Sequence, residues 1–288
     1  MTDGIRRNGN NYYISTAEGL NLLCDFDVAP DPVDKNWNPA WTFYIENDID
    51  MSAYPNFIIA ASDKYKFTGT FDGQGHSITM KSSVSGNAGL FRYAMNITIK
   101  NLTLKGSIEA SNIACGFIVM PNGGTTVEII NCRNEADISG SSASACIGTF
   151  LSNEDKVITI TNFVNLGDIK GSDKGQSYGI ISIVAQDTTI NLNNIYIDGK
   201  IEGQYVSGLI GSAILQNIKI NAEQVAVNAQ LIGSQKAVGF VNAGNYNPIT
   251  LSFTDCYFNG TGASCLVPTD SAVTTTYKGV FDGEANIL

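Results

Sequence analysis

The stretch Ile97-Thr98-Ile99-Lys100-Asn101-Leu102 alternates apolar with polar residues and then places an asparagine before a further apolar residue. The same pattern returns at residues 127–132, 158–163 and 190–195, so that successive asparagines lie 30, 31 and 32 positions apart. A diverged copy at 251–256 carries aspartate in place of the asparagine. A period kept over this many copies indicates a repeat architecture in which every copy forms one structural unit.

Two further landmarks keep the same period. The first is a glycine beside large apolar residues, found at Gly89, Gly116, Gly148, Gly179, Gly208 and Gly239. The second is an isoleucine after a turn-forming pair, found at Ile108, Ile138, Ile169 and Ile201. Each repeat therefore holds three short alternating stretches separated by turn residues, and such alternation is typical of half-buried strands. Three strands in about 31 residues predict one coil of an all-β, single-stranded parallel β-helix.

Stacked coils bring equivalent residues into columns. Coils rise by about 4.8 Å, so we expect the four isoleucines to form one column of the core. We expect a structural ladder of side-chain amides at one corner, formed by Asn101, Asn131, Asn162 and Asn194. One coil departs from the period, because the next asparagine, Asn217, follows Asn194 after 23 residues. We interpret this irregularity as a corner shifted into the segment 215–230.

The segments before and after the repeats predict covers for the two ends of the stack. The capping box Ser15 to Glu18 and the apolar face after it predict a short helix over 16–25, lying on the first coil. Prolines 30, 32 and 39 then indicate an irregular loop, and 42–49 is expected to enter the first strand. Trp37 and Trp41 either pack this cap or bind a sugar. The segment 277–283 echoes 65–73, so it closes the last coil or marks where a partner chain packs. The expected organisation is a cap at 1–64, coils at 65–262 and a closing segment at 263–288.

Composition excludes several classes of partner and of functional site. The net charge is −10 and the pI is about 4.5, which argues against nucleic acid and anionic membranes as partners. His76 is the sole histidine, which excludes a multi-histidine metal site, and no cofactor motif is found. The chain shows no signal peptide after Met1 and no apolar run long enough to cross a membrane. None of the six cysteines lies in a C-x-x-C spacing, so we expect small buried hydrophobes, with disulfides as the alternative.

Three segments, 13–20, 47–51 and 67–78, resemble the opening of bacterial surface and phage proteins that carry GLUG repeats, and Gly208-Leu209-Ile210-Gly211 matches the motif that names the repeat. The string 71–78 is also similar to turns of pectin-lyase-like β-helices. The resemblance covers roughly residues 12–260. It implies a right-handed parallel β-helix in an adhesin, another surface-exposed protein or a virion protein, and it carries over no catalytic residue.

Candidate catalytic residues are few. Asp137 and Asp168 occupy equivalent positions of adjacent coils, about 5 Å apart, a separation that suits a retaining carboxylate pair. Lys200 follows in the same column and Ser107 precedes, so the alternative is a solvated column in which the lysine relieves two like charges. His76, with Asp72 near it in the sequence, is either a catalytic group or a packed corner. Calcium binding at Asp72 lacks a loop of alternating carboxylates.

These observations favour a non-enzymatic structural or adhesive β-helix, most simply a phage or virus virion component such as a tail or head decoration. Its partners are then other virion or surface proteins and a glycan, without membrane insertion, and a homo-oligomer is compatible. The alternatives are a bacterial cell-surface adhesin located outside the cell and a polysaccharide-degrading enzyme of the β-helix type.

Overall fold

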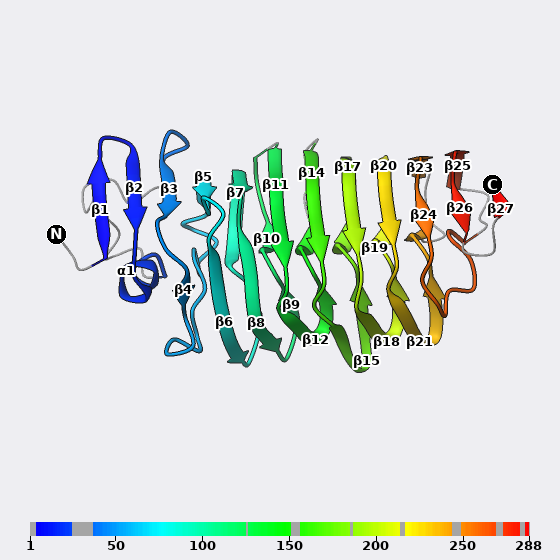
Figure 1. Ribbon diagram of the computed structural model, residues 1–288, viewed down its shortest axis with the longest axis horizontal. Helices are drawn as coiled ribbons and strands as arrows, with labels where there is room; N and C mark the ends of the chain where they lie inside the picture. The colour runs from blue at the N-terminus through cyan, green and yellow to red at the C-terminus, as the bar shows by residue number, and fades with distance from the viewer. Residues whose placement is uncertain are drawn as a thin grey trace.

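The computed structural model describes residues 4–24, 37–124, 126–150, 156–184, 187–213, 217–243, 249–268, 273–282 and 286–287. They form an all-β parallel solenoid of about seven turns with coils of about 30 residues. Figure 1 shows the strands standing side by side along one axis, with the N-terminus at one end of the stack and the C-terminus at the other. The fold expected from the repeat period is therefore confirmed.

Three faces surround the core, and each face is a ladder of strands from successive coils. The first face contains β2 (Asn11–Ile14), β3 (Thr42–Ile45), β5 (Phe67–Asp72), β7 (Phe91–Lys100), β11 (Thr126–Asn134), β14 (Lys156–Asn165), β17 (Thr188–Ile197), β20 (Ile218–Val227), β23 (Ile249–Thr254) and β25 (Val273–Lys278). The second face contains β4 (Ile49–Asp50), β6 (Ser77–Val84), β8 (Thr103–Ala110), β9 (Ile113–Cys115), β12 (Asp137–Ser144), β15 (Ile169–Tyr178), β18 (Lys200–Ser207) and β21 (Gln230–Val238).

The third face is the shortest. It pairs the first residues of β7 with β10 (Ile118–Pro121), β13 (Ile147–Phe150), β16 (Ile181–Val184), β19 (Ile210–Ala213) and β22 (Val241–Ala243). The short strands β24 (Tyr257–Phe258) and β26 (Phe281–Asp282) continue the stack beyond the corner of β20.

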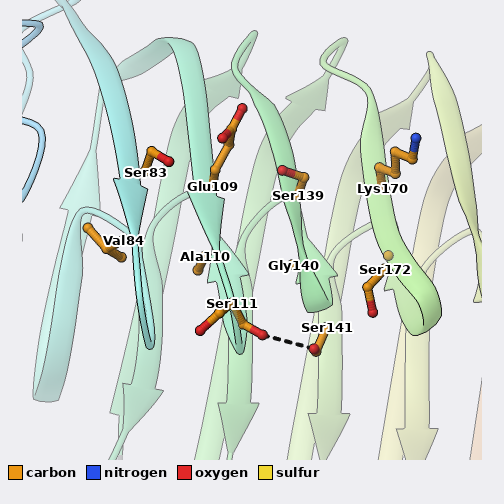
Figure 2. A pocket seen from close by; sticks show the side chains of 11 residues that line it. Ser83, Val84, Glu109, Ala110, Ser111, Ser139, Gly140, Ser141, Lys170 and Ser172 are labelled. Carbon is orange, nitrogen blue, oxygen red and sulfur yellow. Dashed lines mark hydrogen bonds between the residues drawn. The ribbon is translucent and has the colours of Figure 1, made fainter.

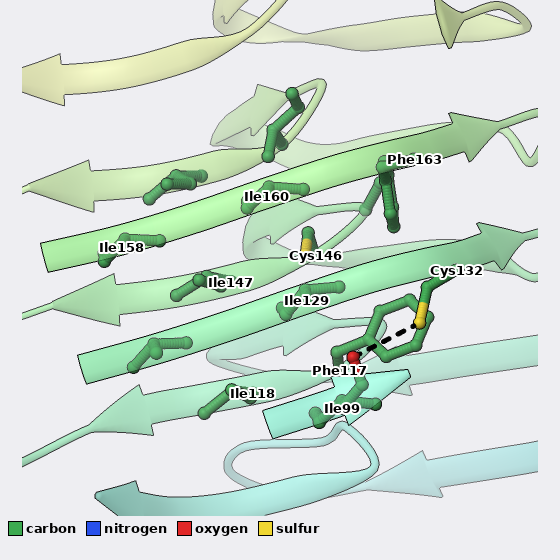
Figure 3. Packing of buried hydrophobic residues seen from close by; sticks show 14 of the residues in the cluster. Ile99, Phe117, Ile118, Ile129, Cys132, Cys146, Ile147, Ile158, Ile160 and Phe163 are labelled. Atoms are coloured by element: carbon green, nitrogen blue, oxygen red, sulfur yellow. Dashed lines mark hydrogen bonds between the residues drawn. The ribbon is translucent and has the colours of Figure 1, made fainter. Parts of the chain in front are cut away.

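The core is a set of aligned apolar columns. The parallel register places Ile108, Ile138, Ile169 and Ile201 side by side, as expected, and each is at most 2% exposed. Burying such a side chain stabilises the fold by about 1.5–3 kcal/mol. Figure 3 shows another part of this core, where Cys132 and Cys146 lie among isoleucines and the rings of Phe117 and Phe163. All six cysteines are free. The four buried ones act as small apolar residues in this core.

Two columns run differently from the sequence expectation. The register pairs Asn194 with Gln224 and places Gln224 at φ 55°, close to the 54° of Asn194. The corner is thus made by Gln224, 30 residues after Asn194, and no coil is irregular there. The expectation of a shifted corner marked by Asn217 is wrong, because Asn217 stacks on Asp187 at a different corner through an amide-to-carboxylate hydrogen bond of 2.8 Å.

The glycine landmark is also misplaced in one coil. Ile118 pairs with Ile147, so the residue equivalent to Gly116 is Ala145 and not Gly148. For the same reason Cys115 pairs with Ser144 in the register rather than with Cys146.

The N-terminal end is covered by more than a helix. Helix α1 (Ala17–Asn21) is shorter than predicted, and its N-cap is Thr16, whose hydroxyl accepts the Gly19 N–H at 3.1 Å. Strand β1 (Ile5–Asn8) pairs antiparallel with β2, so a hairpin forms the outermost layer of this end. Prolines 30 and 32 lie outside the described residues.

The C-terminal segment forms the last rung. Strand β25 stacks on β23 and β26 on β24, and β27 (Asn286–Ile287) pairs antiparallel with β26. The echo seen in the sequence does not fall on equivalent structural positions. Followed from coil to coil, the register stacks Phe71 and Asp72 in the columns of Tyr277 and Lys278, whereas Phe281 and Asp282 lie beyond the corner.

Candidate functional site

A groove crosses the outer surface of the second face, along the solenoid axis. Its larger hollow has a volume of about 470 Å³ and is lined by Ser83, Val84, Glu109, Ala110, Ser111, Ser139, Gly140, Ser141, Lys170, Gly171 and Ser172. A second hollow of about 290 Å³ shares Lys170, Gly171 and Ser172 with the first and continues over β18 and β21. Figure 2 shows Glu109, Ser139 and Lys170 projecting from neighbouring strands. The two hollows form one continuous surface, which we call the axial groove.

A column of small residues creates the floor of the axial groove. The register pairs Ala110 with Val84, Gly140 with Gly171, and Gly203 with Gly233. A Cβ at Gly140 would lie 3.0 Å from the Asn112 carbonyl oxygen, and one at Gly233 would lie 2.2 Å from the Lys236 carbonyl oxygen. A side chain at Gly233 would collide with the backbone and one at Gly140 would be tightly packed, so the surface stays hollow where these strands bend.

One coil widens beside the groove. The register between β12 and β15 jumps from Gly140–Gly171 to Ser142–Gln176, which adds three residues to the bend of β15. The exposed residues 172–174 lie in this bulge, and Ser172 lines both hollows while Asp173 lines the second.

Charges alternate along one wall of the groove. Ser83, Glu109, Ser139, Lys170 and Glu202 occupy one column of the register. Glu202 accepts a hydrogen bond from Lys200, with Nζ and Oε2 2.5 Å apart, and this bond together with the charge of Lys170 lowers the pKa of Glu202. Hydroxyls and single charges of both signs suit hydrogen bonding to a polar polymer.

The carboxylates of Asp137 and Asp168 lie in one column of the same coils, and both accept hydrogen bonds from backbone N–H groups. Asp137 pairs with Ser107, and the Asp137 carboxylate accepts the Asp168 N–H at 3.0 Å. The Asp168 carboxylate in turn accepts the Lys200 N–H at 2.8 Å. Both side chains are exposed, and the Lys200 ammonium bonds Glu202. Each aspartate thus ties its own coil to the backbone of the following coil.

His76 lies beside a different carboxylate from the one expected. Its Nδ1 is 3.5 Å from Oδ1 of Asp48, which also accepts the Ser77 N–H at 2.8 Å. That backbone hydrogen bond is the main reason why the pKa of Asp48 is lowered. Asp72 instead faces Lys100 and Asn101, so the pairing of His76 with Asp72 suggested by the sequence is wrong. No cluster of three or more metal-binding side chains is found among the described residues.

The tryptophans are packed into the cap. Trp37 is 5% and Trp41 4% exposed, and the Trp37 indole N–H donates to the Tyr65 carbonyl at 3.2 Å. The Trp37 ring lies 4.7 Å from that of Phe67, and the Trp41 ring 5.2 Å from that of Tyr12. Burial of this degree leaves neither indole a face on which a sugar could stack.

The asparagine ladder is a continuous chain of hydrogen bonds. Asn194 donates to Asn162 at 2.8 Å, Asn162 to Asn131 at 2.7 Å, and Asn131 to Asn101 at 3.1 Å. Asn101 then donates to Oδ1 of Asp72 at 3.0 Å. The ladder is a structural element that ends on a carboxylate.

The axial groove was not foreseen from the sequence, although a signal for it exists. The isoleucine column is followed two residues later by glycine in three consecutive coils, at Gly140, Gly171 and Gly203. A residue two positions after an inward isoleucine would ordinarily be another inward side chain. Its replacement by glycine in successive coils indicates a bend, and the residues before the glycines, Ser139, Lys170 and Glu202, form the wall of the groove.

The fold defines this chain as a parallel β-solenoid protein. Among solved structures it is similar to one described as a putative immunoglobulin A1 protease from Bacteroides ovatus, with a TM-score of 0.60, 14% sequence identity, and coverage of 96% of this chain and 85% of the other. No protein-family model and no curated protein matches the sequence. The structural similarity supports the β-helix, whereas the expected membership among GLUG-repeat proteins is not confirmed. Within the described residues, no helix is long and apolar enough to cross a membrane.

Proposed function

We propose that this chain is a non-enzymatic, surface-exposed adhesive module whose axial groove binds an extended, neutral, hydroxyl-rich polymer such as a polysaccharide. The observation that carries the proposal is the groove itself, which continues across strands β6 to β21 instead of forming one enclosed pocket. An extended polymer can bind along such a surface through many weak hydrogen bonds to the serine hydroxyls. A strongly acidic polymer is disfavoured by the net charge of −10.

The chemistry of the carboxylates supports a binding role over catalysis. A retaining hydrolase needs one carboxylate free to attack and another to protonate the leaving group. Asp137 and Asp168 each accept a hydrogen bond from a backbone N–H of the next coil, so neither carboxylate is free for that role. We propose a phage or virus particle as the first location of the module and a bacterial cell surface as the second, and a rigid solenoid exposed to the outside suits either.

Glycan binding is tested with an array of neutral and acidic polysaccharides, followed by titration of the best neutral binder. Lys170→Ala removes the charge that both hollows share, and we expect it to weaken binding about tenfold, which corresponds to about 1.4 kcal/mol. Lys219→Ala changes another exposed lysine, on β20 of the first face, and should leave the affinity unaltered. Equal affinities of the two variants, or no binding to any polysaccharide, would contradict the groove as the binding site.

Two further experiments test the enzyme alternative and the location of the protein, on a virion or on a cell envelope. Release of reducing ends from a bound polysaccharide, abolished by Asp137→Asn, would overturn the non-enzymatic proposal. Gentle fractionation of the source, followed by mass spectrometry, distinguishes the two locations. Co-purification with capsid or tail proteins supports the virion component, and recovery with the cell envelope supports the cell-surface adhesin.

A further inference from the structure

The outermost strands at the two ends of the solenoid differ in charge: β1 carries an inward-pointing arginine, whereas residues 273–277 of β25 carry no charge. At the N-terminal end, Arg7 lies in register with the buried Tyr12, so its side chain points toward the end of the core. Its guanidinium lies 5.0 Å from the ring centre of Tyr12 and 5.7 Å from that of Trp41. An inward-pointing charge on an edge strand is a recognised protection against pairing with another chain, because that pairing would bury the charge.

The residues of strand β25 itself supply no inward charge of this kind. Among the described residues it pairs with β23 alone, and residues 273–277 contain no charge. Val273, Thr275 and Tyr277 are in register with the buried Ile249, Leu251 and Phe253, so their side chains continue the core columns. The Tyr277 ring stacks on Phe253 at 5.6 Å and is only partly buried.

The backbone of β25 determines which groups face outward. The Lys278 carbonyl accepts the Asp255 N–H at 2.8 Å and therefore points back into the stack. Successive residues of a strand direct their N–H and C=O groups to opposite sides, so those of Thr274 and Thr276 point toward β23. The N–H and C=O groups of Val273, Thr275 and Tyr277 then point away from the stack, and an unprotected row of this kind is a template for strand pairing.

We propose that β25 is a dimerisation edge, and that a second copy of this chain pairs antiparallel with it about a two-fold axis at Thr275. In this register Thr275 faces its own copy, while Val273 faces Tyr277 of the other chain. The same three residues on both chains supply outward N–H and C=O groups, so the hydrogen bonds are mutually satisfied. The inward side chains of both chains then cover each other's open core.

A second copy is favoured over a head-to-tail filament because the N-terminal edge is closed by Arg7. A tail-to-tail contact uses the same patch on both chains and therefore closes as a dimer, without growing further. The inference is independent of the groove, which lies on the second face, so failure of glycan binding would not affect it.

The first test is the native mass, measured by light scattering over a concentration series. We expect twice the 30.7 kDa of one chain at high concentration. Thr275→Arg places an inward charge on β25, as Arg7 does on β1, and should return the protein to one chain. Thr276→Arg adds the same charge on the exposed side of the same strand and should leave the dimer intact, at most about tenfold weaker.

Hydrogen exchange on the unaltered protein provides the second test. The amides of Val273, Thr275 and Tyr277 should become protected as concentration rises, while those of Thr274 and Thr276 should be protected throughout. Protection of all five at every concentration, with a mass of one chain, would mean that another segment of the same chain covers this edge, and the proposal would be wrong. A dimer that persists in Thr275→Arg would equally overturn it.

Discussion

At the scale of single residues, the corner of each coil depends on a side chain that tolerates a left-handed backbone. Asn101, Asn131, Asn162 and Asn194 all have φ between 53° and 54°, a region where asparagine is enriched among non-glycine residues. Their amides then satisfy one another along the stack, and the last donor reaches Asp72. Desolvation raises the pKa of Asp72, but hydrogen bonds from the Asn101 amide and the Gln74 N–H, together with Lys100, outweigh it and hold this pKa below its usual value.

The lowered pKa predicts a dependence of stability on pH. A carboxyl whose pKa is lower in the folded state stabilises the fold at pH values above its unfolded pKa, and this stabilisation is lost as the pH falls through the folded pKa. We therefore expect the free energy of unfolding, measured by urea titration, to fall below about pH 4, and Asp72→Asn to lack this component while keeping an acceptor for Asn101. Asp173→Asn, in the exposed bulge, is the control and should follow the unaltered protein. A pH profile identical for both variants would contradict this role of Asp72.

At the scale of the strand and coil, close approach of the backbones requires small residues. A Cβ added at Gly208 would lie 2.1 Å from the Gly239 carbonyl oxygen of the next coil and 2.7 Å from Val227 Cγ1. We expect Gly208→Ala to destabilise the protein by about 1–3 kcal/mol in urea unfolding, because backbone atoms must shift. Ala145→Gly, in the same column, should cost only about 0.5–1 kcal/mol of chain entropy. Equal costs for the two variants would show that coil spacing adapts freely.

The same scale shows which elements the sequence could predict. The period of the Asn and Ile columns predicted the strands because each repeat buries the same side chains. The corner at Gln224 was hidden because glutamine is not a usual residue for a positive φ, and only the stacking of neighbouring coils imposes it. The axial groove depends on pairings between segments distant in sequence, and single-strand patterns do not encode such pairings directly.

At the scale of the whole molecule, a solenoid is stabilised chiefly by contacts between neighbouring coils, so its ends open more readily than its middle. Four cysteines report on this difference. Cys115, Cys132 and Cys146 lie in adjacent central coils, whereas Cys256 lies beside the last rung. Burial raises the pKa of all four thiols, to about 12 for Cys132 and about 11 for Cys256, so none reacts until its coil opens.

Pulsed alkylation with peptide mapping by mass spectrometry should therefore resolve an order of opening. In the native protein we expect reaction at the two partly exposed thiols, Cys24 and Cys265. In mild urea Cys256 should react next, and the three central thiols should follow together, because each central coil is held by neighbours on both sides. Pairing of β25 with a second copy would protect the C-terminal coils. The difference in alkylation rate between Cys256 and the central thiols should therefore shrink as protein concentration rises, and it should persist in Thr275→Arg. A single rate for all four buried thiols at low concentration would instead mean that the solenoid opens as one cooperative unit.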